Sequence, residues 1–197
     1  MRVGPDRYRK ATLVLPLPDG DTRERVIFFA EEGERLRMLG FHRIRRHHEA
    51  PSGETIVFNP GPANPLQGLA NQVPVDTYTY LSLFTALGGL ASEEASTRTH
   101  LWVSGGGAFP VEIAAAGREE LSVLGTRSQS RRLRLRSAEG RGREALYWLA
   151  DAPPHSFLQY RGPADFLVDG GAGDDSETIL LRVTSSSEQV NRVFGGS

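Results

Sequence analysis

Apolar and polar residues alternate along most of the chain, a pattern typical of β-strands because successive side chains point to opposite faces. Turns rich in glycine and proline separate the alternating segments. This regular spacing predicts an antiparallel meander that curls on itself. The alternating segments are 12–15, 25–30, 34–48, 54–58, 99–104, 109–115, 119–124, 131–136, 144–149, 157–160, 166–168 and 178–184.

One segment departs from this alternation and follows a helical period instead. Its apolar residues recur three and four positions apart, which places them in one stripe along a helix. A single apolar-faced helix among many strands is expected to lie on a curved sheet or to close one end of a barrel. The stripe consists of Tyr80, Phe84 and Leu87, with Leu83 and Leu90 beside them.

Residues at both ends of this segment predict a helix over 76–87. Asp76 or Thr77 would cap the N-terminus by accepting a hydrogen bond from a free backbone N–H group. Gly88 or Gly89 would take the left-handed conformation that ends many helices. A second, short helix is predicted from Ser187 to Phe194.

The 197 residues fit one domain, and we expect a single mainly-β domain over residues 1–197. It would be a strongly curved antiparallel sheet or open β-barrel of about ten strands with one packed helix. Residues 1–9 are expected to be loose, Gly40 to mark a bulge or bend, and 116–118 to form a turn. The proline- and glycine-rich segment 59–74 is expected to be a long loop that is either functional or mobile.

Charge and composition exclude several classes of protein. The net charge of −1 gives no general attraction to nucleic acid or to anionic membranes. No apolar run reaches the roughly 20 residues of a transmembrane helix. Cysteine is absent, which excludes disulfides and thiolate metal sites. Because no apolar segment follows the first residues, the protein is expected to be cytoplasmic unless a leader was removed before the first residue.

A row of arginines in segment 34–48 is a candidate anion-binding site. Guanidinium groups offer a planar fork of donors that suits phosphates and carboxylates. The simpler interpretation, favoured roughly three to one, is a solvated sheet face paired with nearby glutamates, since arginines are mostly exposed. The members, on one face if the strand is continuous, are Arg35, Arg37, Arg43, Arg45 and His47.

A second arginine stripe alternates with leucines further along the chain. Arg132, Arg134 and Arg136 are expected to lie on an outer face or to protect a sheet edge against aggregation.

Aromatic and apolar residues of the helix and of two strands form the other candidate site. Their simplest interpretation is a packed core. The functional interpretation is an apolar cavity of the kind in which small barrels hold a lipid or similar ligand. The residues that would line it are Tyr80, Leu83, Phe84, Trp102 and Trp148.

No catalytic, metal or cofactor site is predicted. On a strand, segment 47–49 supplies at most two ligands on one side, whereas zinc needs three or four. The triple glycine at 105–107 precedes a strand rather than the helix that a phosphate-binding loop requires. Ser104 or Ser156 with His155 and Asp151 would form a catalytic triad only if the fold assembled them, because no nucleophile motif orients them.

Two short motifs resemble an uncharacterised bacterial envelope family, domain-of-unknown-function family thirty-one-oh-eight. The first is the segment Val75 to Phe84, in which an aspartate precedes the helix. The second is Leu-Tyr-Trp-Leu-Ala-Asp at 146–151, followed by Pro153 and Pro154. The resemblance implies a curved antiparallel sheet and a periplasmic or envelope location, and it implies no catalytic residues.

The sequence therefore favours a non-enzymatic envelope protein that binds an apolar or amphipathic ligand or a protein partner. The first alternative is a structural or interaction module that uses its arginine-rich strands. The second is a hydrolase whose site is assembled only in three dimensions.

Overall fold

Twelve strands and one helix are found in the part of the chain that the structure, a computed structural model, describes. The mainly-β fold, with a strongly curved sheet and one packed helix, is confirmed. Contacts divide the chain into two compact units, residues 1–77 and 78–197, which are described separately below. Whether the two behave as one domain stays a prediction. The described residues are 7–16, 22–46, 51–61, 64–90, 96–103, 107–123, 125–139, 144–153, 155–163 and 178–182.

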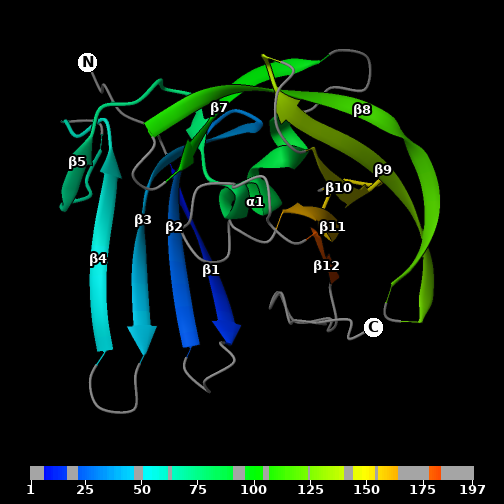
Figure 1. Ribbon diagram of the computed structural model, residues 1–197, viewed down its shortest axis with the longest axis horizontal. Coiled ribbons are helices and arrows are strands. Elements are labelled where there is room, and N and C mark those ends of the chain that lie inside the picture. Colours follow the sequence, from blue (N-terminus) through cyan, green and yellow to red (C-terminus); the bar gives the residue numbers. More distant parts are fainter. Residues whose placement is uncertain are drawn as a thin grey trace. The chain divides into compact units, whose positions relative to one another are not determined.

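The first unit is a five-stranded sheet in the order β1-β2-β3-β4-β5 (Figure 1). Neighbouring strands are antiparallel except β4 and β5, which are parallel. The strands are β1 (Tyr8–Pro16), β2 (Thr22–Glu32), β3 (Arg35–Arg46), β4 (Pro51–Phe58) and β5 (Leu69–Asn71).

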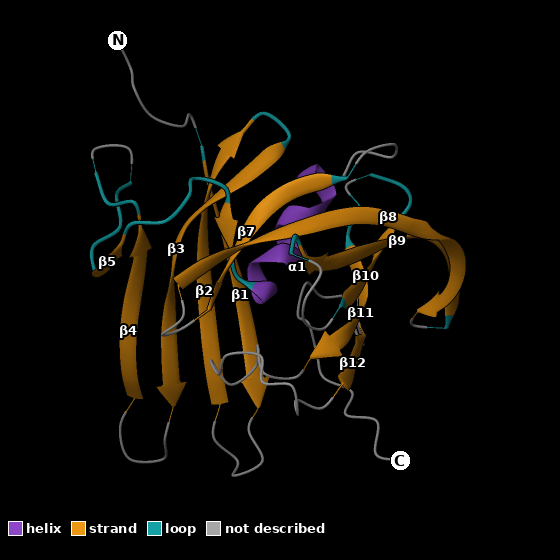
Figure 2. Ribbon diagram, turned by 45° about the horizontal axis from the view of Figure 1, so that its top comes forward, coloured by secondary structure: helices purple, strands orange, loops and turns teal. Residues whose placement is uncertain are grey.

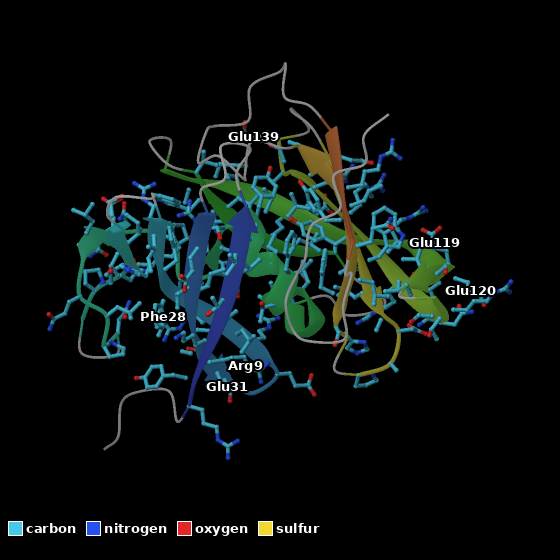
Figure 3. The ribbon with its side chains drawn as sticks, turned by 90° about the horizontal axis from the view of Figure 1, so that it is seen from below. Arg9, Phe28, Glu31, Glu119, Glu120 and Glu139 are labelled. Carbon is cyan, nitrogen blue, oxygen red and sulfur yellow. The ribbon has the colours of Figure 1, made fainter. Side chains whose placement is uncertain are left out.

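Strand β1 begins earlier than the sequence indicates, inside the segment 1–9 that was expected to be loose. Tyr8 pairs with Ala30 of β2, and the pairing continues along the whole of β1. Arg9 Nε donates a hydrogen bond of 3.0 Å to Glu31 Oε1, and Figure 3 shows the two side chains close together. These cross-strand contacts hold the polar start of β1 in the sheet, although its low hydropathy predicted a loose N-terminal tail.

A β-bulge interrupts β3, at the position where the sequence predicts one. Phe28 of β2 pairs with Gly40 and Phe29 pairs with Met38, so Leu39 is an extra residue. Gly40 has φ +150°, a conformation that residues with a side chain rarely adopt. A Cβ on Gly40 would lie 2.2 Å from the carbonyl oxygen of Ile56 on β4. Glycine is therefore required here by conformation and by space.

The segment 59–74 is tied to the sheet rather than free of it. It contains β5, which the sequence does not predict, and the backbone N–H of Asn59 donates to the Asn71 carbonyl oxygen at 2.8 Å. Asn64 is buried, and its Nδ2 donates to the carbonyl oxygens of Leu39 (2.9 Å) and Phe58 (2.7 Å). One side chain thus satisfies the carbonyl of the bulge residue and closes the loop over the sheet.

The second unit contains the curled sheet, whose strands follow the order β12-β11-β10-β9-β8-β7-β6. Figure 1 shows the long strands β8 and β9 bending together in an arch. The strands are β6 (Thr77–Tyr78), β7 (Thr97–Val103), β8 (Gly107–Val123), β9 (Thr126–Ser137), β10 (Ala145–Ala150), β11 (Phe157–Pro163) and β12 (Thr178–Arg182).

Residues 116–118 form a second bulge rather than the predicted turn, so β8 is one strand where two were expected. Ala115 pairs with Leu133 and Arg118 pairs with Arg131, which leaves one residue too many on β8. Gly117 has φ +110°. The guanidinium of Arg132 donates two hydrogen bonds to the Ala116 carbonyl oxygen, of 3.0 Å from Nε and 2.7 Å from Nη2. The glycine bends the strand without reversing it, and the arginine satisfies the displaced carbonyl.

The helix α1 (Tyr80–Leu90) begins four residues later than predicted, because a different residue caps it. The backbone N–H of Ser82 donates to Thr79 Oγ1 at 3.2 Å, and that of Thr79 donates to Ser82 Oγ at 2.8 Å. This reciprocal pair is a capping box in which serine replaces the usual glutamate. Asp76 lies outside the helix and Thr77 lies in β6.

The C-terminus of α1 also differs from the prediction. Gly88 and Gly89 lie inside the helix, which extends to Leu90. Thr97 Oγ1 donates a 2.9 Å hydrogen bond to the Leu90 carbonyl oxygen, so a side chain from β7 satisfies the last turn. Among the described residues, no helix has the length and apolarity needed to cross a membrane.

The sheet of the second unit has two chemically different faces. Figure 2 shows α1 against this sheet. Phe84 of α1 contacts Tyr147 of β10, so the face that carries Tyr147 is called the helix-side face. By cross-strand register this face also carries Leu133 and Leu135 of β9. The opposite face, which carries Arg132, Arg134 and Arg136, is called the charged face. Because β9 lies between β8 and β10, this arginine stripe is on a sheet face and not at an edge.

Two predicted elements lie outside the described residues. They are the strand at 166–168 and the helix from Ser187 to Phe194.

We predict that Gly40→Ala destabilises the protein by about 2–5 kcal/mol, because the new methyl group meets the Ile56 carbonyl in a strained backbone conformation. Gly33→Ala is the matched control. Gly33 also has positive φ, +65°, but has no atom near the added Cβ, so this change should cost only about 1–2 kcal/mol. Urea unfolding measures both. Equal losses in the two variants would mean that the close approach at the bulge has no energetic weight.

We predict that Phe84→Ala costs about 3–5 kcal/mol, the usual range for a core aromatic residue. Phe84 is 7% exposed and contacts three other rings of the second unit. The free energy of unfolding, measured by chemical denaturation, checks this. A variant as stable as the wild type would show that α1 is not docked on its sheet.

Candidate functional site

An aromatic cluster joins α1 to the helix-side face of the curled sheet. Phe84 stacks on Phe157 of β11, with ring centroids 4.3 Å apart and an interplanar angle of 15°. Tyr147 meets Phe84 edge-on at 5.8 Å, and Tyr160 lies 5.7 Å from Phe84. Such ring pairs contribute about 0.5–1.5 kcal/mol each beyond their burial. The cluster therefore helps to hold the helix on the sheet.

The two tyrosines of this cluster differ in how their hydroxyl groups are satisfied. Tyr160 donates a 3.1 Å hydrogen bond to the Pro163 carbonyl oxygen. Tyr147 is fully buried, and its hydroxyl has no hydrogen-bond partner among the described residues. Burial, with Tyr160 and Tyr80 nearby, raises the pKa of Tyr147 well above its ordinary value. The Tyr147 hydroxyl is thus a neutral hydrogen-bond donor in an apolar environment. Such a group is costly to bury unless an acceptor for its hydrogen bond is present.

A buried arginine lies on the same face, close to the aromatic cluster. Arg131 is 7% exposed and pairs in register with Leu149, two residues along β10 from Tyr147. On its other side Arg131 pairs with Arg118 of β8. Like charges directly opposite each other destabilise a sheet. Arg118 Nε lies 3.4 Å from Asp151 Oδ1, so a carboxylate lies beside this guanidinium.

The five residues predicted to line an apolar cavity are not brought together. Phe84 belongs to the aromatic cluster, and Leu83 is fully buried while Tyr80 is half-buried on the same helix. Trp148 alternates with Tyr147, and Trp102 pairs in register with Ala108, so both tryptophans lie on the charged face. The sequence predicts that both tryptophans face inward, because tryptophan is apolar. The alternation of side chains along β7 and β10 places them on the face opposite the helix.

Trp148 has a structural partner on the charged face. Its indole Nε1 donates a hydrogen bond to Glu119 Oε1, and Arg132 Nη1 lies 3.5 Å from the same oxygen. Figure 3 marks Glu119 on the curled strands. This arrangement explains how an indole is buried on a polar face, since its N–H group bonds to a carboxylate.

The three arginines of the stripe on the charged face are paired with glutamates across strands. Such pairs are partly exposed and contribute little each. They match each arginine of the stripe with an acid, which agrees with the predicted outer face. The pairs are Arg132 with Glu119 (3.5 Å), Arg134 with Glu144 (3.8 Å) and Arg136 with Glu112 (2.9 Å).

The predicted anion site of the first unit does not form one face. The bulge at Leu39 shifts the alternation of β3, so Arg35 and Arg37 lie on one side of the sheet and Arg43 on the other. The condition of a continuous strand, on which the prediction depended, is not met. Arg37 Nε bonds to Glu32 at 2.6 Å and Arg43 Nε bonds to Glu54 at 2.7 Å. The side chain of Arg45, and all of His47, lie outside the described residues.

Three of the residues considered for catalysis lie between β10 and β11, where His155 and Asp151 have other partners. His155 Nδ1 bonds to the Ala150 carbonyl oxygen at 3.1 Å, and Asp151 lies beside Arg118. Ser104 lies outside the described residues. Within the described part of the chain, no group of three or more histidine or acidic residues is placed to hold a metal ion.

Sequence reasoning missed the two residues that make the helix-side face chemically distinctive. Tyr147 was not named among the residues of the candidate cavity, and Arg131 was left out of the arginine stripe that begins one residue later. The strand parity of the segment 131–136 separates Arg131 from Arg132, since consecutive residues point to opposite faces. The sequence alone could therefore have predicted that Arg131 lies on the face of the leucines.

Comparisons with protein-family models, with curated proteins and with solved structures find no match to this chain. The resemblance to the uncharacterised envelope family stays a prediction.

We predict that the Glu112 carboxyl titrates below its ordinary pKa of 4.5, chiefly because Arg136 donates hydrogen bonds to it. A lowered folded-state pKa stabilises the protein above the unfolded pKa, and this contribution is lost as pH falls through the folded value. NMR titration of the side-chain carboxyl measures the pKa. Arg136→Met should raise it, whereas Arg127→Met, which removes a partner of Glu120, should not. An unchanged value in Arg136→Met would contradict the assigned cause.

Proposed function

We propose that the second unit binds a long-chain amphipathic ligand on the helix-side face of its curled sheet. The observation that carries the proposal is the Tyr147 hydroxyl, which is buried among aromatic rings with no hydrogen-bond partner among the described residues. Native structures rarely leave a buried donor unsatisfied, and the exceptions often have a functional explanation. A ligand oxygen that accepts this hydrogen bond would remove the cost.

The surroundings of Tyr147 match the rest of such a ligand. Apolar and aromatic side chains from the helix and from three strands line the same face, as in pockets that take apolar molecules through a few placed polar groups. The apolar and aromatic residues of this face are Phe84, Ile113, Leu133, Leu135, Phe157 and Tyr160. An alkyl chain would pack against these residues while one oxygen reaches Tyr147.

Entry of the ligand requires α1 to move, because the cluster is closed to solvent. Phe84 is 7% exposed and Tyr147 is fully buried. The helix has only 11 residues and contains Gly88 and Gly89, so it is not stable without its packing. A short helix that depends on its packing is a better candidate for a gate than one that is stable on its own.

The alternative of an interaction module based on arginine-rich strands receives less support, because Arg132, Arg134 and Arg136 are each paired with a glutamate. Envelope location and the absence of enzymatic activity remain predictions.

The test compares binding of methyl oleate by delipidated wild-type protein and by Tyr147→Phe, using native mass spectrometry and tryptophan fluorescence. Tyr147→Phe should weaken binding about 3–10-fold through loss of one hydrogen bond. Its stability should not fall, because the change removes an unsatisfied buried donor.

Tyr160→Phe is the matched control. It deletes a hydroxyl that the protein itself satisfies, so it should cost about 0.5–1.5 kcal/mol of stability and leave binding unchanged. The proposal fails if the wild type binds no methyl oleate or if Tyr147→Phe binds it as tightly as the wild type.

A further inference from the structure

We propose that strand β1 is an interaction surface whose partner is the β1 strand of a second copy of this chain. The two strands would pair antiparallel and join two five-stranded sheets into one. This inference concerns the first unit and does not depend on ligand binding by the second.

One side of β1 offers backbone groups to a further strand. In the described part of the chain β1 is the end strand of its sheet and pairs only with β2, as Figure 1 shows. An edge strand presents a row of N–H and C=O groups that another strand can bond. Proteins recognise strands of other chains in this way.

The register shows which residues of β1 present these groups. The backbone N–H of Glu31 donates to the carbonyl oxygen of Arg7 at 3.0 Å, and the β1–β2 register places these two residues opposite each other. In an antiparallel ladder, pairs that exchange hydrogen bonds alternate with pairs that do not. The odd-numbered residues of β1 therefore bond to β2, and the even-numbered ones direct their backbone groups to the free edge. The outward residues that have an N–H group are Tyr8, Lys10, Thr12 and Val14.

The side chains of these outward residues are exposed as well. Tyr8 is 55% exposed and Val14 is 47% exposed, although both are large apolar residues. Lys10 and Thr12 between them are also exposed. The long, flexible stem of a lysine lets its ammonium group stay in water when a strand pairs beside it. A partner strand would cover the two apolar side chains without burying a charge.

One antiparallel register makes β1 complementary to itself. It sets Tyr8 opposite the partner's Val14, and two-fold symmetry repeats this pair. Aromatic residues opposite β-branched ones stabilise antiparallel strands. In the same register Lys10 lies opposite the partner's Thr12. Ala11 lies opposite the partner's Ala11 at the two-fold axis, where small side chains allow a close approach.

The two neighbouring registers with the same bonding pattern are less favourable. A shift of two residues in one direction sets Lys10 directly opposite the partner's Lys10, and like charges in this position destabilise a sheet. The opposite shift sets Tyr8 against the partner's Pro16, which has no N–H group to donate. The edge therefore specifies both its partner and its register.

Sedimentation equilibrium of the full chain measures dimerisation, and Thr12→Pro tests the role of the edge. The wild type should be a weak dimer with a Kd of about 1–100 µM, as expected for an interface below the standard size. Proline removes an outward N–H that makes no bond to β2, and edge strands tolerate proline at such positions. Thr12→Pro should therefore raise the Kd about 10-fold or more.

Thr12→Val is the matched control. It makes its change at the same position and removes the hydroxyl, but it keeps the backbone N–H and a β-branched side chain. It should dimerise like the wild type.

Ala11→Cys tests the register and also covers the case in which Thr12→Pro does not fold. The chain contains no cysteine, so the new thiol is the only one. Residues of a pair that is not hydrogen-bonded lie about 4.5 Å apart between Cα atoms, within the range that a disulfide spans. Ala11→Cys should therefore form a disulfide-linked dimer on mild oxidation. Lys10→Cys and Thr12→Cys would do so only in the two shifted registers and should not cross-link.

Each other outcome overturns the inference. A wild type that sediments as a monomer well above about 100 µM has no such interface. A dimer that Thr12→Pro leaves equally tight is held by another surface. Failure of Ala11→Cys to cross-link, or cross-linking at residue 10 or 12 in its place, contradicts the assigned register. None of these results bears on binding of methyl oleate by the second unit.

Discussion

The described strands depend on one constraint, which is that a long strand can bend sharply only if the backbone groups released at the bend find new partners. Each unit meets it in the same way. A glycine with positive φ permits the bulge, at Gly40 in one unit and at Gly117 in the other. A polar side chain then binds the displaced carbonyl, Asn64 at Leu39 and Arg132 at Ala116. Without these donors each bulge would leave a backbone acceptor unsatisfied, at a cost comparable to the loss of a hydrogen bond.

The bulges also explain which features of the fold could be predicted from the sequence and which could not. Alternation predicts strands well, because it reports which side chains share a face over a few residues. Alternation cannot show that an extra residue reverses the faces of all residues after it. Arg35 and Arg43 were therefore assigned to one face, although the bulge places them on opposite faces. The glycine at 117 looked like a turn, because a turn and a bulge both require positive φ and differ only in where the chain goes next.

The helix and the candidate site were predictable in part for similar reasons. The apolar stripe identifies α1, and Phe84 at its centre is buried as expected. Its true start depends on a hydroxyl pair, Thr79 with Ser82, that competes with the more conventional cap at Asp76. The buried hydroxyl of Tyr147 was not predictable, because its lack of a partner depends on side chains distant in sequence.

The bulge at Gly117 has a consequence for the pairing of β8 with β9. Residues 131–136 read Arg-Arg-Leu-Arg-Leu-Arg, so a slip of two residues in one direction would set Leu133 opposite Ile113 and Arg134 opposite Glu112. The side-chain ladder alone is therefore nearly degenerate between registers. The bulge breaks this degeneracy, because only one alignment brings the Arg132 guanidinium to the Ala116 carbonyl. The feature that curves the sheet thus also selects its register from a repetitive sequence.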